Sequence, residues 1–147
     1  KKVHALILNV MQTCPVDRTR IYVTGQSMGG IGTWDVILRH PELFAAAIPI
    51  CGSGSPKHAA NVRALPLRFF HGAKDPTVPV SGSREMAAAL KAAGSAAFAY
   101  TELPEGGHVI MKEVWATPGL IDWLFEQRRP ADNKPWRDAE GRPCSGP

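Results

Sequence analysis

Short apolar segments alternate with longer amphipathic segments along most of this 147-residue chain. The apolar segments predict strands, at residues 21–24, 45–50, 67–70 and 98–103. The amphipathic segments repeat apolar residues at helical spacing and predict helices, at residues 2–12, 27–39, 83–93 and 118–129. Residues 52–64 predict a loop with a short helix after Pro56. Because parallel strands need crossovers that are usually helical, this order predicts an α/β fold, a parallel sheet between two helical layers in a three-layer sandwich.

The charge and hydropathy of the chain argue against two classes of function. Of the net charge of +4, residues 128–147 supply five basic and three acidic groups, which leaves +2 for the rest. That near-balanced remainder lacks the clustered basic stripe that binds nucleic acid. The longest apolar run, residues 43–51, has nine residues including a proline, whereas a membrane-spanning helix needs about 20. We therefore predict no nucleic-acid partner and no membrane span.

The three cysteines, Cys14, Cys51 and Cys144, have neither C-x-x-C spacing nor a paired histidine. Zinc sites and thioredoxin-like sites usually have one or the other. We therefore predict no metal ion. The odd number of cysteines prevents complete pairing within the chain and leaves the compartment open.

The first residues have some features of a signal peptide, because Lys1-Lys2 precede an apolar stretch. His4 and Asn9 interrupt that stretch, and no small-x-small cleavage site follows. The spacing instead predicts an amphipathic helix whose buried stripe is formed by Val3, Leu6, Ile7, Val10 and Met11. Since the first residue is not methionine, we expect the chain to begin inside a longer protein.

A G-x-S-x-G pattern, Gly25-Gln26-Ser27-Met28-Gly29, stands where a predicted strand ends and a predicted helix begins. The pattern alone is weak, because common residues often occur at this spacing by chance. Its position is the one that a nucleophile elbow requires, since a sharp turn there presents the serine hydroxyl at the edge of the sheet. Gly25 and Gly29 let neighbouring backbone pass closely, and Gly30 and Gly32 extend this small surface. The alternative is a glycine-rich turn with an inert serine.

A serine nucleophile needs a base, and the base needs an acid that orients it. After a nucleophile elbow, the chain order is serine, acid, histidine, near the ends of successive strands. Asp75 follows the strand at 67–70, and His108 follows the strand at 98–103. His108 is the only histidine after Asp75, so this order leaves one base for that acid. His71 is expected to form local hydrogen bonds rather than to catalyse.

The remaining acids and histidines fit simpler roles. Three aspartates follow every histidine and fail the order rule: Asp122, Asp132 and Asp138. Four others fit exposed helix or turn positions: Asp35, Glu42, Glu102 and Glu105. Three histidines fit surface positions: His4, His40 and His58.

Several segments together resemble one family. They are RIYVTGQSMGG at residues 20–30, RHPELFAA at 39–46, HGAKDPTVP at 71–79, Gly107-His108, and WLFEQRR at 123–129. The chain is similar to bacterial α/β-hydrolases over residues 1–129. It most closely resembles predicted peptidases and phospholipase/carboxylesterases, a group similar to feruloyl esterases and polyhydroxyalkanoate depolymerases.

The resemblance implies a serine hydrolase that cleaves carboxylic esters through an acyl-enzyme. Ser27 would be the nucleophile, His108 the base and Asp75 the orienting acid, with the backbone N–H of Met28 as one oxyanion donor. It implies no cofactor, and a small-molecule or polymer-linked ester as substrate. Two alternatives stay open: a peptidase of the same fold, and a catalytically silent hydrolase-like fragment that acts as a binding module.

The chain departs from that family at its front. The family fold begins with several strands and a loop that supplies the other oxyanion donor, and these are missing here. We therefore expect residues 1–129 to be the C-terminal part of one α/β-hydrolase domain, and residues 130–147 to be a loose, Pro-rich tail. The resemblance favours a secreted or periplasmic location, and oligomeric state is left open.

Overall fold

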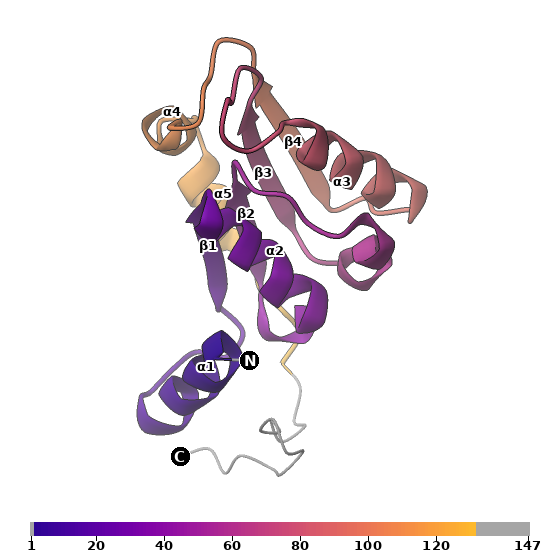
Figure 1. Cartoon of the computed structure of the whole chain (residues 1–147). Helices are drawn as coiled ribbons and strands as arrows, with labels where there is room; N and C mark the ends of the chain where they lie inside the picture. The colour runs from indigo at the N-terminus through magenta and orange to yellow at the C-terminus, as the bar shows by residue number, and fades with distance from the viewer. Residues whose placement is uncertain (1, 132–147) are drawn as a thin grey trace.

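The computed structural model describes residues 2–131, which form an open parallel sheet with helices on both faces (Figure 1). The sheet has four strands, in the spatial order β1-β2-β3-β4. Their bounds are β1 Tyr22–Gln26, β2 Ala46–Ile50, β3 Leu67–Gly72 and β4 Phe98–Leu103. Every neighbouring pair is parallel. The α/β fold predicted from the alternation of segments is confirmed.

The helices that follow the first one divide between the two faces of this sheet, whereas the first lies beyond the start of β1 (Figure 1). The α-helices are α1 Lys2–Thr13, α2 Met28–Arg39, α3 Ser81–Ala92, α4 Met111–Trp115 and α5 Leu120–Glu126. Two 3-10 helices, η1 Pro41–Leu43 and η2 Pro56–Val62, lie in the connections around β2. One core cluster joins the sheet to α2, η2 and α3, and a second joins its other face to α4 and α5. These two clusters make the three-layer sandwich.

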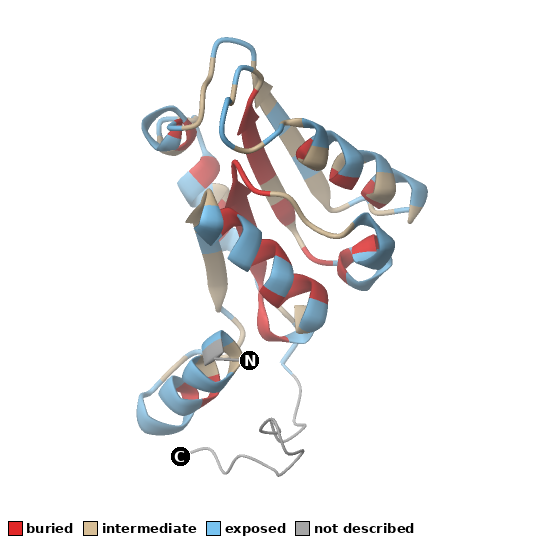
Figure 2. Cartoon of the chain, viewed as in Figure 1, coloured by how far each residue is buried: buried red, intermediate tan, exposed pale blue. Residues whose placement is uncertain are grey.

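Strand β2 lies at the centre of the core, and all five of its residues are buried (Figure 2). Ala47 packs in the cluster with α2 and α3, whereas Ile48 and Ile50 pack in the cluster with α4 and α5. This burial on both faces explains why the segment is a continuous apolar run rather than an alternating one. Pro49 has no N–H to donate, and β2 is in register with β3 at the positions on either side of it, Ala47 and Ile50.

The buried faces of the first two helices differ from those predicted. In α1, Leu8 and Met11 are buried, but Val3 and Leu6 are exposed. In α2, the helical apolar spacing predicts a buried stripe of Met28, Ile31, Trp34 and Leu38, but Met28 and Ile31 are exposed. The buried face is formed by Gly30, Thr33, Trp34, Val36, Ile37 and Leu38. The apolar spacing identified each helix correctly, but more than one apolar face was available to be buried.

The C-terminal part of the fold also departs from the prediction. The last helix begins at Leu120 rather than at Pro118, because Gly119 precedes it with a φ of 71°. It ends at Glu126, and Gln127 is already extended. Helix α4 was not predicted, since it has a single buried residue, Val114, and so shows no apolar period.

No helix within residues 2–131 is both long and apolar enough to cross a bilayer. The expected Pro-rich tail falls mainly outside the described residues, which include only its first two positions, Pro130 and Ala131. The proposed division at residue 129 therefore stays a prediction. Just before it, the N–H of Arg129 donates to the carbonyl of Thr19 at 3.0 Å.

Candidate active site

Ser27 occupies a sharp turn between the end of β1 and the start of α2. Its φ of 58° and ψ of −120° lie in a region that side-chain-bearing residues rarely adopt. Its N–H donates to the carbonyl of Ile50 on the neighbouring strand at 3.0 Å. Strained backbone of this kind persists only where surrounding contacts hold it, and it is often found at functional sites. The local geometry is that of a nucleophile elbow.

The glycines around the elbow have different roles. A Cβ on Gly25 would lie 2.5 Å from the carbonyl carbon of Gly29, and one on Gly30 would lie under 3.0 Å from the Ile50 carbonyl oxygen. A Cβ on Gly29 or Gly32 would meet nothing within 4 Å. Gly25 is therefore needed because the Gly29 backbone passes close to it, and Gly30 is needed because α2 packs closely on β2 there. The packing role expected for Gly32 is not seen.

The structure brings Ser27, His108 and Asp75 into one hydrogen-bonded chain. Ser27 Oγ lies 2.8 Å from His108 Nε2, and His108 Nδ1 lies 2.8 Å from Asp75 Oδ2. The three residues follow β1, β4 and β3, respectively. Because the strands are parallel, their carboxyl ends meet at one edge of the sheet, which brings together residues up to 81 positions apart.

The side chain of Asp75 is fully buried, and both of its carboxylate oxygens accept hydrogen bonds. Oδ1 accepts from the amides of Thr77 at 2.8 Å and Val78 at 2.9 Å, while Oδ2 accepts from His108. Burial by itself raises the pKa of this carboxyl, but the hydrogen bonds from His108, Val78 and Thr77 outweigh it and lower the pKa to about 2. Asp75 is therefore ionised at neutral pH and able to orient His108.

The loop that carries His108 is held by residues from two other strands. The side-chain amide of Gln26, directly before Ser27, donates to the backbone carbonyl of His108 at 2.6 Å. A Cβ on Gly72 would clash with the carbonyl oxygens of Gly106 and Gly107, so the loop packs directly on the end of β3. In the sequence, Gln26 is a variable position of the G-x-S-x-G pattern, and no local signal marks its contact with His108.

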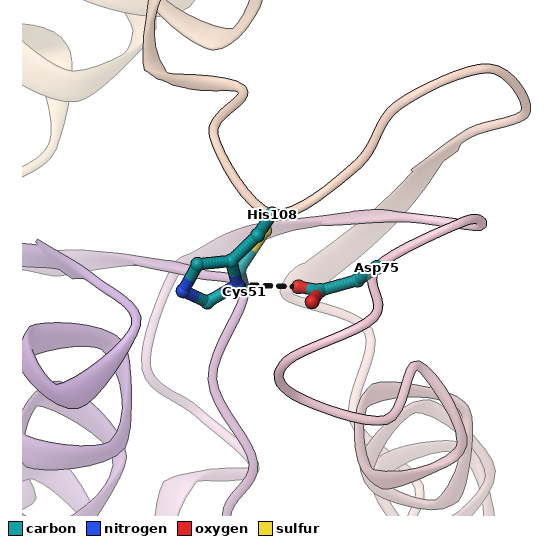
Figure 3. Close-up of side chains that lie close together, drawn as sticks. All are labelled: Cys51, Asp75 and His108. Atoms are coloured by element: carbon teal, nitrogen blue, oxygen red, sulfur yellow. Dashed lines mark hydrogen bonds and ion pairs between the residues drawn. The ribbon is translucent and has the colours of Figure 1, made fainter.

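Cys51 is a second residue at the site that the sequence did not point to. Figure 3 shows it beside the ion pair of Asp75 and His108, and ligand atoms of the three residues lie within 4.8 Å of one another. Burial, together with the charge of Asp75 and despite a backbone hydrogen bond from Gly72, raises the pKa of this thiol to about 11. The thiol is therefore protonated at neutral pH and a poor nucleophile.

Cys51, Asp75 and His108 are also the one group within the described residues with a spacing that could hold a metal ion. The thiol would have to lose its proton, and the hydrogen bond between Asp75 and His108 would have to open. These costs argue against a resident metal, and the expectation of no metal and no cofactor stays a prediction.

Met28 is the first residue of α2, so its N–H belongs to the first-turn amides that have no acceptor within a helix. Its side chain is 83% exposed. This position directly after Ser27 is where an oxyanion donor stands in a nucleophile elbow. Its role at the site stays a prediction.

A family model described as the dienelactone hydrolase family matches residues 1–113. The chain belongs to the dienelactone hydrolase family. The resemblance to α/β-hydrolases seen in the sequence is confirmed by this match. The chain is also 45% identical over 69 residues to Esterase LipQ of Mycobacterium tuberculosis, in an alignment that covers 47% of this chain and 15% of that protein.

Solved structures give the same fold. A thermostable esterase superposes with a TM-score of 0.77 at 37% identity, covering 87% of this chain and 36% of that one. SOBER1 F65L of Arabidopsis thaliana gives a TM-score of 0.70 at 21% identity, covering 85% of this chain and 62% of that one. The acylaminoacyl peptidase of Pyrococcus horikoshii gives a TM-score of 0.66 at 20% identity, covering 80% of this chain and 26% of that one. The chain of this dienelactone hydrolase family member thus spans less than two thirds of each relative.

Proposed function

We propose that this member of the dienelactone hydrolase family is a serine hydrolase that cleaves carboxylic esters. The observation that carries the proposal is the continuous chain from Ser27 Oγ through His108 to Asp75, with 2.8 Å at both steps. A serine hydroxyl is a weak nucleophile until a base takes its proton, and this geometry places an oriented base at that proton.

The residues perform the reaction in two halves. As Ser27 Oγ attacks the ester carbonyl carbon, His108 Nε2 takes the hydroxyl proton and Asp75 stabilises the resulting imidazolium through Nδ1. The N–H of Met28 donates to the carbonyl oxygen as it becomes negative. When the tetrahedral intermediate collapses, His108 returns the proton to the leaving alcohol oxygen. Water then attacks the acyl-enzyme with His108 again as base, which releases the carboxylic acid and restores Ser27.

The similarity to named esterases favours ester over amide substrates. Esterase LipQ and the thermostable esterase are 45% and 37% identical to this chain over the aligned parts. The acylaminoacyl peptidase is 20% identical, so its likeness supports the fold alone. We therefore propose a carboxylesterase-type activity on small-molecule or polymer-linked esters.

The test is hydrolysis of short-chain aryl esters and labelling by a fluorophosphonate probe, with mass spectrometry to locate the adduct. We expect wild-type protein to carry the label on Ser27, and Ser27→Ala to lose both the label and the turnover. Ser81→Ala is the matched control, because Ser81 is exposed at the start of α3. It should behave as wild type.

Two outcomes would contradict the proposal. Unchanged ester turnover in Ser27→Ala would assign the activity to another group. A folded chain that the probe does not label would favour the silent, binding-module alternative instead.

A further inference from the structure

His71 is a buried histidine that the proposed reaction does not use. It lies near the end of β3, four residues before Asp75, and its side chain is completely inaccessible. Its Nδ1 lies 2.7 Å from Ser83 Oγ on α3, and its Nε2 lies 3.0 Å from the carbonyl oxygen of Val78. The same Nε2 lies 3.3 Å from Asp75 Oδ2, the oxygen that His108 also contacts. Asp75 therefore faces two imidazole rings.

The protons available to this cluster can be counted. Ser83 Oγ also lies 3.1 Å from the carbonyl oxygen of Gly52, so a series of three hydrogen bonds, called links below, runs from Gly52 through Ser83 and His71 to Val78. Both ends are carbonyl oxygens, which only accept, so three links need three protons. Ser83 supplies one proton and a neutral imidazole supplies one more. Only a ring protonated on both nitrogens fills every link.

The charged groups around His71 fit a positive ring. Asp75 faces it from the loop after β3, and Glu102 is its register partner on β4. Hydrogen bonds from Arg84 and Tyr100 lower the pKa of Glu102 to about 2, so Glu102 is ionised at neutral pH. Arg84 is bound to Glu102 through two hydrogen bonds, so its charge is already paired.

Other titratable groups around this cluster are Cys51, whose raised pKa keeps its thiol neutral, Tyr100, whose pKa is raised by burial, and His108, which contacts the same Asp75 oxygen. Ser83, Gly52 and Val78, which contact the ring or its hydroxyl partner directly, are uncharged.

We propose that His71 is a positioning residue of the active site: it carries a proton on both ring nitrogens, and its positive charge, 3.3 Å from Asp75 Oδ2, holds that oxygen in place for His108. This inference rests on the proposed function. As a second cation on the carboxylate, His71 also limits how strongly Asp75 favours the protonated form of His108. Its loss would let Asp75 move, and would remove a positive charge that helps to keep His108 in its base form.

The first test needs no turnover. With ¹⁵N-labelled histidine in the full chain, two-bond proton–nitrogen spectra distinguish neutral tautomers from the doubly protonated ring. At pH 7.5 we expect the doubly protonated pattern for His71, with the exposed His58 as the internal reference signal. A neutral pattern for His71 at this pH would overturn the proposal, whether or not the protein is an esterase.

The second test is kinetic. In His71→Gln we expect kcat to fall about tenfold or more with KM little changed, because Asp75 Oδ2 loses the positive ring that lies 3.3 Å away. We also expect the acid limb of the pH profile to move to higher pH. His58→Gln should leave both unchanged. A folded His71→Gln variant with a wild-type pH profile would refute the positioning role, whereas an inactive wild-type protein would refute the proposed function and leave the spectroscopic result to decide the state of His71.

Discussion

The substitution Asp75→Asn tests the proposed reaction at its most constrained residue. Asn has the shape of Asp but carries one oxygen and one NH₂ group. The amides of Thr77 and Val78 can only donate, and they lie 2.8 and 2.9 Å from Oδ1. They therefore hold the Asn oxygen at that position and place the NH₂ group at the position of Oδ2, which faces His108.

That orientation changes the tautomer of His108. An NH₂ group must meet an acceptor at Nδ1, so the ring proton moves to Nε2, which lies 2.8 Å from Ser27 Oγ. The ring then donates to the serine and can no longer take its proton. In serine hydrolases with this triad, the same change of acid to amide lowers kcat by about 10⁴. We expect a loss of that order, about 5 kcal/mol of transition-state stabilisation.

The assay is aryl-ester turnover together with the rate of fluorophosphonate labelling, with circular dichroism to show that each variant is folded. Asp122→Asn is the matched control, since Asp122 is exposed on α5 and its replacement changes the net charge equally. It should keep wild-type activity. A folded Asp75→Asn variant that retains a tenth or more of the wild-type rate would refute the assignment of Asp75 as the orienting acid.

Three further predictions follow from contacts of the same site. Gly30→Ala should destabilise the fold by about 1–3 kcal/mol, because the new Cβ would meet the Ile50 carbonyl. Gly32→Ala should stabilise it by about 0.5–1 kcal/mol, because it replaces an exposed helical glycine whose new Cβ meets no neighbouring atom. Urea unfolding measures both changes, and equal effects would contradict the packing at Gly30. The pKa of Asp75 is lowered on folding from 3.8 to about 2, so its ionisation should contribute about 2 kcal/mol to the free energy of unfolding above pH 4, and this should disappear as the pH falls toward 2. Unfolding of wild type and Asp75→Asn between pH 2 and pH 5 measures that contribution, and parallel curves would exclude it. Gln26→Leu should lower kcat about tenfold, because the His108 carbonyl loses its hydrogen-bond donor. The control Gln127→Leu should leave kcat unchanged, although it breaks a similar side-chain hydrogen bond to the Trp123 carbonyl on α5. Equal rates for the two variants would show that Gln26 does not position the base.

The strands and the three candidate catalytic residues could be predicted because each leaves a local signal. The buried strands are short apolar runs, and Ser27, Asp75 and His108 each follow one of them. The rule that parallel strands end at one edge of the sheet then brings the three residues together without any knowledge of side-chain positions.

The buried faces of the helices could not be predicted as well, because α1 and α2 are apolar on more than one side. Val3 and Leu6 are exposed while Leu8 is buried, and only the position of the neighbouring elements decides this. The contacts of Gln26 and Cys51 were missed for a related reason. Each depends on the path of a loop after another strand, and the sequence has no periodicity that reports such a path.

His71 shows why a correct local prediction can still be incomplete. It does form local hydrogen bonds, as expected from its position before Gly72. The segment from His71 to Val78 also contains Asp75 and the two amides that hold Asp75 Oδ1, so one short turn supplies the acid and most of its support. The base is held differently: His108 depends on Asp75 through its ring and on Gln26 through its backbone.

This division has a consequence for how the site keeps its geometry. Gln26 and Ser27 are consecutive, so the residue that fixes the backbone of the base is tied directly to the nucleophile. A shift of the His108 loop relative to β1 would lengthen the Gln26 contact and the Ser27 contact together. The distance from Ser27 Oγ to His108 Nε2 is therefore controlled mainly at the elbow, and the direction of the imidazole ring mainly at the turn from His71 to Val78. These two anchors, which are joined by a hydrogen bond from the Lys74 N–H to the Gly106 carbonyl at 2.9 Å, explain how an open sheet can hold three residues from distant parts of the chain together.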